Sequence, residues 1–358
     1  MQYDLPAHDE LEVSLFGPGV GECVVIHIGH GSWIIIDSCV DENSIPIALS
    51  YLEKIGVNPE RAVKFIVISH WHDDHIQGLS EVVRRCMNAK IIYSAALLKK
   101  EFLTLVDVMN DPTLVIDRGK SGLKEMASVV GTLHRRKTNS SVTIDLVPAM
   151  ADKRLFSNQD VEVWTLSPSN RDFNNALCEF GTMTDKLSTD YRGVVPAPTE
   201  NRNAVAMWIR FGEMNIILGA DLEESGSVES GWSAIVHSTG RPQGKANIFK
   251  VPHHGSSTGH CEDVATQILD QPISILTAYR RSKIPKEMDL SRIVGFSESV
   301  YLTTSASGKK TRRNHSVDKL FKSTVSNRMV LGGKVGHIRL RGRESIAVEL
   351  AGPAEKVA

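Results

Sequence analysis

The chain lacks the features that mark several large classes of protein. None of its apolar runs approaches the roughly 18 consecutive residues of a membrane span. Its first ten residues, MQYDLPAHDE, lack the basic and apolar regions of a secretory signal. Five cysteines without a CxxC pair argue against a disulfide framework and against a cysteine zinc knuckle. We therefore expect a cytoplasmic protein without membrane contact, and we expect its thiols to be reduced.

The composition is that of a globular protein. The 358 residues include 41 Lys and Arg, 42 Asp and Glu, and 41% hydrophobic residues, which is too balanced for a disordered chain. The charge is nevertheless uneven, because the stretch from Arg280 to Arg343 contains sixteen basic and four acidic residues. Such a stretch is the footprint expected for a polyanionic partner, whereas solvated cations on unrelated faces explain it equally well. Both readings stay open on charge alone.

Hydrophobic patterning predicts an α+β protein without internal repeats. Each half of the chain begins with antiparallel strands and continues with alternating strands and helices, which predicts two mixed sheets with outer helices. We expect a single domain over residues 1–358 with a loop-rich insertion at about 99–200. Strands are predicted at 12–16, 23–28, 33–36, 62–68, 90–93, 142–147, 161–166, 204–211, 215–218, 246–251, 272–277, 299–303, 336–340 and 345–350. Helices are predicted at 44–55 with Ser44 as its cap, 75–86, 97–109, 121–136, from about 222, and near 262–269.

The strongest chemical signal is the segment from residue 69 to 75, SHWHDDH, where an apolar strand meets a helix. It places His70, His72 and His75 beside Asp73 and Asp74. Imidazole nitrogens and carboxylate oxygens are the ligands of zinc and similar metals, and a tight turn lets several of them converge. A polar helix cap would account for one aspartate but not for three histidines. The segment therefore indicates a metal site.

Two later clusters also follow strands. Asp221 ends the segment LGAD, in which small residues let the backbone approach a ligand closely. His253 and His254 stand between proline and glycine in VPHHGS, which is typical of a rigid loop. Both clusters can add ligands to the same metal site. His27 and His237 lie in apolar runs, so we interpret them as core or sheet residues.

The spacing of His70, His72, Asp74 and His75 is HxHxDH, the signature of the metallo-β-lactamase superfamily. The strand ending at Asp37 resembles the strand that precedes this signature in the family. The later segments NRNA, ILGAD and VPHHGS are most similar to the branch that contains the cytoplasmic domain of the competence protein ComEC and the phosphorylcholine esterases. The resemblance extends over roughly residues 11–350.

The resemblance implies an αββα four-layer sandwich with two divalent metal ions, usually zinc and sometimes manganese, that share a bridging hydroxide. His70 and His72 would hold the first ion, Asp74 and His75 would hold the second, and Asp221 would bridge them. Asp37 would orient a ligating imidazole.

The resemblance leaves some assignments open. His254 would complete the second metal site and His253 would contact an oxyanion of the substrate, but the sequence does not fix which histidine has which role. The family's further histidine has no clear counterpart, since His134 is the only histidine between His75 and Asp221 and its basic surroundings suggest an exposed helix. Where a His-Pro pair usually follows the next strand, the chain has RRSKIP from residue 280, whose cations could hold phosphate.

We therefore predict a metal-dependent hydrolase, first of all a phosphodiesterase or nuclease, in which Asp74 positions or deprotonates water and His253 binds an oxygen of the substrate. A small-molecule esterase, thioesterase or lactamase is the second hypothesis, because the same fold supports all of these. A third is a non-catalytic module that binds a protein partner or nucleic acid within a multi-component system, for example one that defends against phage. Nucleic acid or another phosphodiester is the expected substrate.

Overall fold

The computed structural model describes residues 3–109, 121–139, 145–189, 201–306 and 334–358. Two eight-stranded sheets dominate these residues, with strand orders β15-β14-β1-β2-β3-β4-β5-β6 and β16-β13-β12-β11-β10-β9-β8-β7. The first sheet consists of β1 (Leu11–Gly17), β2 (Cys23–Ile28), β3 (Trp33–Ile36), β4 (Val63–Ile68), β5 (Lys90–Ser94), β6 (Leu146–Ala149), β14 (Gly336–Gly342) and β15 (Ile346–Ala351). The second consists of β7 (Lys153–Ser157), β8 (Val161–Thr165), β9 (Met207–Phe211), β10 (Met214–Leu218), β11 (Ala246–Lys250), β12 (Leu269–Leu276), β13 (Ser299–Leu302) and β16 (Glu355–Lys356).

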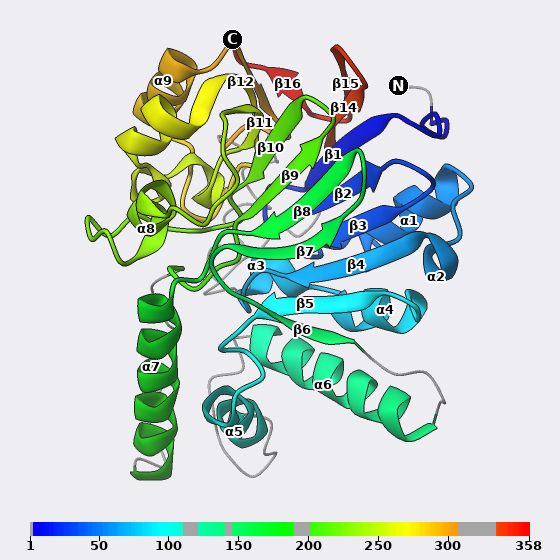
Figure 1. The fold of residues 1–358 in the computed structure, drawn as a ribbon. Helices are drawn as coiled ribbons and strands as arrows, with labels where there is room; N and C mark the ends of the chain where they lie inside the picture. Colours follow the sequence, from blue (N-terminus) through cyan, green and yellow to red (C-terminus); the bar gives the residue numbers. More distant parts are fainter. Residues whose placement is uncertain (1–2, 110–120, 140–144, 190–200, 307–333) are drawn as a thin grey trace, which may run out of the picture.

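Helices cover the outer face of each sheet (Figure 1). On the first sheet lie α1 (Ile47–Lys54), α2 (Pro59–Ala62), α3 (Asp73–Ile76), α4 (Leu79–Arg85), α5 (Lys100–Met109), α6 (Ser121–Asn139) and α7 (Asn170–Thr189). On the second lie α8 (Gly231–His237), α9 (Glu287–Phe296) and the short turns η1 (His253–Gly255), η2 (Ser257–Gly259) and η3 (Val264–Ile268). Among the described residues, no helix has the length and apolar character needed to cross a membrane.

Alternation of side chains along the strands builds the layers. In β2, Val24 and Ile26 face the second sheet, whereas Cys23 and Val25 face the helices. One hydrophobic core therefore lies between the two sheets, and one further core lies between each sheet and the helices that cover it. Three cores separate four layers, so the predicted α+β class and αββα arrangement are confirmed.

Each sheet combines antiparallel and parallel pairing. Strands β3 to β6 pair in parallel in the first sheet, and β10 to β13 pair in parallel in the second. The remaining pairs are antiparallel. The SHWHDDH segment, Asp221 and the His253–His254 pair follow the carboxyl ends of parallel strands β4, β10 and β11. Loops at these ends are where open sheets bind ligands.

Several predicted elements differ from the structure. Helix α1 begins after Pro46, and Ser44 has a φ of 63° and does not cap it. The predicted helix at 75–86 is broken by Gly78, whose φ of 75° belongs to the left-handed region. The helix predicted from about 222 starts only at Gly231, and the segment near 262–269 forms a π turn instead of an α-helix. Elements β7, β16, α7 and α9 were not predicted.

The predicted insertion at 99–200 contains three helices and three strands in its described part. Strand β6 extends the first sheet, and β7 and β8 extend the second. Helix α7 packs against α5 through Phe180, whose ring centroid lies 5.0 Å from that of Phe102. The described part of the segment thus contains regular structure, while the loop-rich insertion stays a prediction, because residues 110–120, 140–144 and 190–200 lie outside the described residues.

The basic stretch from Arg280 to Arg343 does not form one solvated face. Arg339 is 1% exposed and pairs with Asp4 and Glu349, and Arg341 pairs with Asp4 and Glu12. These arginines therefore stabilise the edge of the first sheet. Seven basic residues of the stretch lie outside the described residues: Lys309, Lys310, Arg312, Arg313, Lys319, Lys322 and Arg328.

Candidate metal centre

The SHWHDDH segment links the end of β4 to α3, and it turns its histidines inward. His70 is 2% exposed and His75 is fully buried. The ring centroid of His70 lies 4.2 Å from that of His75 and 4.8 Å from that of His72. Asp74 follows on the first turn of α3 with a side chain that is 13% exposed. The four residues of the HxHxDH spacing therefore gather at one end of the sandwich.

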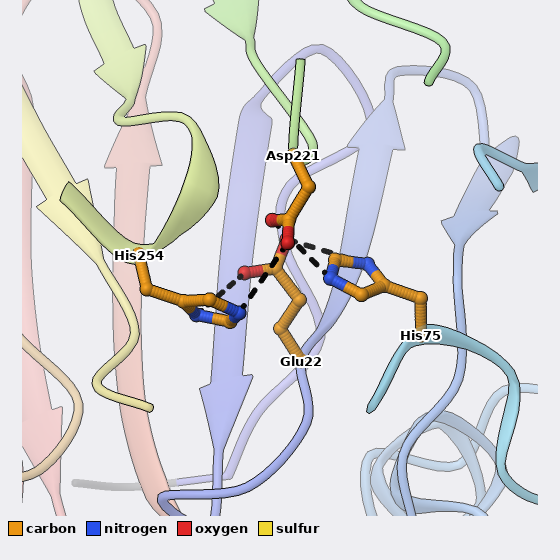
Figure 2. A group of neighbouring side chains, drawn as sticks. All are labelled: Glu22, His75, Asp221 and His254. Atoms are coloured by element: carbon orange, nitrogen blue, oxygen red, sulfur yellow. Dashed lines mark ion pairs between the residues drawn. The ribbon is translucent and has the colours of Figure 1, made fainter. Parts of the chain in front are cut away.

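Asp221 and His254 reach the same place from the second sheet (Figure 2). Asp221 Oδ1 lies 3.3 Å from His75 Nε2, and Asp221 Oδ2 lies 3.6 Å from His254 Nε2. His254 Nε2 is also 3.2 Å from Asp74 Oδ2. Asp221 is thus situated between two imidazoles that come from different sheets. These residues are far apart in the sequence, and the packing of the two sheets brings them together.

Left-handed backbone brings these side chains inward. Ala220, just before Asp221, has a φ of 42°, and His253 and His254 have φ values of 47° and 53°. Non-glycine residues in this region cost free energy and are concentrated at functional sites. Gly219 has little space for a side chain, since a Cβ there would lie 2.9 Å from Pro252. The small residues of LGAD therefore permit close approach of the two loops, as the sequence indicates.

Asp37 fixes two of the histidines. Its Oδ2 accepts from His75 Nδ1 at 2.7 Å and from Ser69 Oγ at 2.6 Å. Because the single hydroxyl proton of Ser69 goes to Asp37, Ser69 Oγ accepts from His70 Nδ1 at 2.9 Å. In their neutral forms, both imidazoles then carry their proton on Nδ1 and leave Nε2 free to bind a metal. The predicted orienting role of Asp37 rests on this contact with His75.

The donor atoms fit a divalent metal. Among the described residues, His70 Nε2, His75 Nε2 and Asp221 Oδ1 are buried polar atoms without a hydrogen-bonding partner. Burying such atoms without hydrogen bonds is costly. His75 Nε2 and Asp221 Oδ1 lie 3.3 Å apart as an ion pair, and a cation would satisfy both together with His70 Nε2. Ligand atoms of Asp37, His70 and His75 lie within 4.8 Å of one another, and so do those of Glu22, His75, Asp221 and His254. Nitrogen with carboxylate oxygen is the set that zinc and similar ions take.

Opposite charges shift the pKa values of these groups. Burial raises the pKa of Asp221, but His75 and His254 outweigh burial and hold it well below its usual range. Burial lowers the pKa of His75, yet Asp221, Glu22 and Asp37 raise it well above the ordinary value. His70 shows the opposite result, because burial and the neighbouring His75 lower its pKa. The positive charge of imidazolium thus offsets the negative charge of the nearby carboxylates, and a metal cation would offset it in the same way.

His253 points to a different partner. Its Nδ1 lies 3.0 Å from Glu223 Oε1 and 2.8 Å from Thr258 Oγ1, and its side chain is 22% exposed. Burial lowers the pKa of His253, but the hydrogen bond to Glu223 and the nearby charges of Asp221, Glu223 and Asp74 together raise it above its ordinary value. His254, not His253, is therefore the member of the pair that lies with Asp221 and Asp74.

The other histidines have structural surroundings or lie at the surface. His27 is buried with its Nδ1 2.8 Å from the carbonyl oxygen of Glu10, in agreement with a core role. His237 is exposed at the end of α8, so its interpretation as a core residue was wrong. His134 is exposed on α6, as expected. Asp73 accepts from the backbone N–H of Gly122 and thereby caps α6.

Two buried residues beside the centre escaped sequence analysis. Glu22 precedes β2 and Lys250 ends β11, and both are almost completely buried. Lys250 Nζ lies 2.5 Å from Glu22 Oε1. A lysine at the end of an apolar strand, just before VPHHGS, was the available signal. Tyr279 is the third neighbour, since its ring stacks on His254 with centroids 5.2 Å apart.

Comparison with known proteins agrees with the site. A family model of the metallo-β-lactamase superfamily matches residues 16–108, about a quarter of the chain, which include the HxHxDH segment. No curated protein matches the sequence significantly.

Among solved structures, the chain is similar to a variant of a metallo-β-lactamase from Cronobacter sakazakii, with 14% identity, a TM-score of 0.36 and coverage of 66% of this chain and 75% of that one. It is similar to the Rm3 metallo-β-lactamase with 14% identity, a TM-score of 0.35 and coverage of 72% and 82%. A metallo-β-lactamase-fold protein from Bacillus subtilis has 12% identity, a TM-score of 0.33 and coverage of 67% and 70%. All three likenesses are distant.

The family match includes the HxHxDH segment and the strand ending at Asp37 but not the later segments of the predicted resemblance, and the two-sheet sandwich agrees with the fold of that superfamily. Similarity to the ComEC and phosphorylcholine esterase branch stays a prediction. Over residues 16–108, this chain is therefore identified as similar to the metallo-β-lactamase superfamily.

Proposed function

We propose that this chain is a metal-dependent hydrolase of the metallo-β-lactamase superfamily that cleaves the phosphodiester bonds of nucleic acid. The observation that carries the proposal is the set of buried ligand atoms on His70, His75 and Asp221 that form no hydrogen bond, with His75 Nε2 and Asp221 Oδ1 in ion-pair contact at 3.3 Å. Asp74 and His254 stand within 3.2 Å of each other beside this set. His72, whose ring lies next to His70, completes the proposed ligands.

Three of the proposed ligands are more deeply buried than Asp74 and His253, the two residues that would contact substrate; Asp74 is also a proposed ligand. The side chains of His75, Asp221 and His254 are 3% exposed or less. Asp74 and His253 are 13% and 22% exposed. We assign the two exposed groups to catalysis, because a substrate that enters the site can reach them.

Cations beside the site favour a phosphodiester. Arg281 and Lys283 are exposed on the loop that follows Tyr279, the residue stacked on His254. Arg280 is held in place by Thr304 Oγ1 at 2.5 Å. Guanidinium groups bind phosphate oxygens with two parallel hydrogen bonds, which suits a nucleic-acid backbone.

Each residue then has a defined task. His70, His72, Asp74, His75, Asp221 and His254 would hold divalent cations, with zinc favoured and manganese as the alternative, which would supply a water of lowered pKa, towards about 7, and would offset negative charge on the phosphate. Asp74 orients the attacking water and accepts its proton at Oδ2. His253, held through Nδ1 by Glu223, presents its other ring edge to a phosphoryl oxygen.

Cleavage of labelled single-stranded and duplex DNA and RNA tests the proposal, with zinc or manganese added. The control is Asp74→Ala, measured in the same preparation and with its metal content determined. We expect cleavage by the wild type alone, and we expect it to weaken as salt rises because phosphate contacts are lost. A metal-loaded wild type that cleaves small esters, thioesters or lactams but no polynucleotide would contradict the substrate. Metal-loaded protein without any hydrolysis would favour a partner-binding module.

A further inference from the structure

The buried ion pair between Glu22 and Lys250 has no role in the function proposed above. Glu22 is 2% exposed and belongs to the first sheet, whereas Lys250 is fully buried in the second. A buried lysine is rare unless its charge is paired, and this pair lies directly behind the candidate metal centre. Burying two charges costs free energy that an apolar pair would avoid, so we expect these two charged side chains to make contacts with the centre.

Lys250 supports the backbone that carries Asp221. Its Nζ lies 2.5 Å from Glu22 Oε1 and donates to the carbonyl oxygen of Ala220 at 2.8 Å. Ala220 is the left-handed residue just before Asp221, and its carbonyl oxygen also accepts from the backbone N–H of His253. The ammonium group is still 4.0 Å from Asp221 Oδ1. Lys250 thus holds the loop without occupying the carboxylate.

Glu22 acts on the other side through Thr277. Thr277 Oγ1 donates to Glu22 Oε2 at 2.7 Å. Because this uses its only proton, Thr277 Oγ1 accepts from His254 Nδ1, which is 2.8 Å away. In the neutral imidazole the proton then lies on Nδ1, and Nε2, which is 3.2 Å from Asp74 Oδ2 and 3.6 Å from Asp221 Oδ2, keeps its lone pair for a metal ion bound among these groups.

The geometry allows a second reading for Glu22, since its carboxylate lies within 4.8 Å of the ligand atoms of His75, Asp221 and His254. Both of its oxygens are already engaged, however, one by Lys250 and the other by Thr277. A metal would have to displace a buried ammonium group to bind Oε1. Figure 2 shows the Glu22 carboxylate between His75 and His254 and next to Asp221; its oxygens lie 3.9 Å from His75 Nδ1 and 3.8 Å from His254 Nδ1, on the side of each ring away from Nε2.

We propose that Glu22 is a positioning residue, not a metal ligand: paired with Lys250, it fixes His254 through Thr277 in the tautomer that binds metal. This rests on the proposed function, because it assigns His254 to the metal centre. It parallels Asp37, which reaches His70 through Ser69 in the same manner. Two buried carboxylates, one per hydroxyl relay, would then set the histidines of the centre.

Metal binding by Thr277→Val, Thr277→Ser and Glu22→Gln proteins tests this. Affinity is measured by competition with a chelator, and the visible spectrum of the cobalt-loaded protein reports the ligand set. Thr277→Val should weaken the binding of one of two cobalt ions about 10- to 100-fold, and Thr277→Ser should restore it. Glu22→Gln should weaken the same ion to a similar extent, and its cobalt spectrum at saturation should match that of the wild type.

The outcomes separate the two proposals. If Glu22→Gln changes the cobalt spectrum while Thr277→Val binds as the wild type does, Glu22 is a ligand and the relay is wrong. If the wild type binds metal and hydrolyses substrate but Thr277→Val binds equally well, the relay fails and the proposed function stands. If the wild type binds no divalent cation, the proposed function fails and the relay with it. Thr277→Ser also controls for folding, because it keeps the hydroxyl and loses only a methyl group.

Discussion

Asp37 Oδ2 lies 2.7 Å from His75 Nδ1, and both side chains are buried. The same carboxylate accepts from the backbone N–H of Ser69 at 2.8 Å and from its hydroxyl. One aspartate at the end of β3 thereby fixes the direction of two imidazoles. This contact determines the ligand geometry before any metal binds, and four predictions test its consequences and those of its surroundings.

Asp37→Asn should weaken metal binding about 10- to 100-fold, because the amide cannot accept from His75 and Ser69 together. Ser69→Ala is the matched comparison, since it removes only the acceptor of His70 and should have a smaller effect. Competition with a chelator measures both affinities. Equal affinity in Asp37→Asn and wild type would show that the imidazoles need no orienting acceptor.

Asp221→Ala should lower kcat/KM at least about a thousandfold with the fold intact, because the residue contacts both His75 and His254. Asp74→Ala should have a similar effect on turnover. Circular dichroism and metal content, measured on the same samples, distinguish a lost centre from an unfolded protein. Full activity of folded, metal-stripped Asp221→Ala would remove this residue from the mechanism.

Arg341→Met should destabilise the protein by about 3 kcal/mol, because it leaves the fully buried Glu12 without its partner. The double variant Glu12→Gln with Arg341→Met should recover much of this loss. Urea denaturation measures both. The salt dependence of nucleic-acid binding should not change in Arg341→Met, since this arginine is committed to the sheet; a change would return Arg341 to the substrate-binding face.

His337→Gln should reduce the dependence of stability on pH. Burial, followed by Arg339 and Lys54, lowers the pKa of His337 to about 3 from an ordinary value of 6.5. Below about pH 6.5 the unfolded chain takes up a proton that the folded protein excludes, so this residue makes the free energy of unfolding fall as pH falls. Wild type should therefore lose about 3 kcal/mol more than His337→Gln between pH 7 and pH 4. Parallel urea titrations that coincide would contradict the buried, neutral imidazole.

Local patterns in the sequence predicted the parts of this protein that depend on near neighbours. Short, nearly continuous apolar runs located β2 and β3 at their observed ends, because a strand between two layers must be apolar on both faces. The HxHxDH spacing predicted a metal site in the same local way, since four residues within a six-residue segment, His70 to His75, can converge in a tight turn. The sequence did not predict the break between α3 and α4, where Gly78 adopts a left-handed backbone conformation.

Contacts between distant segments were decided only by the tertiary structure. Asp37 meets His75 across two parallel strands, and Glu22 meets Lys250 across the two sheets. No sequence spacing predicts either pair, because the packing of the layers, and not the distance along the chain, determines which side chain contacts a buried charge. Arg339 and Arg341 show the same effect: the sequence alone presents them as part of a basic stretch, and burial beside Asp4, Glu12 and Glu349 makes them part of the sheet.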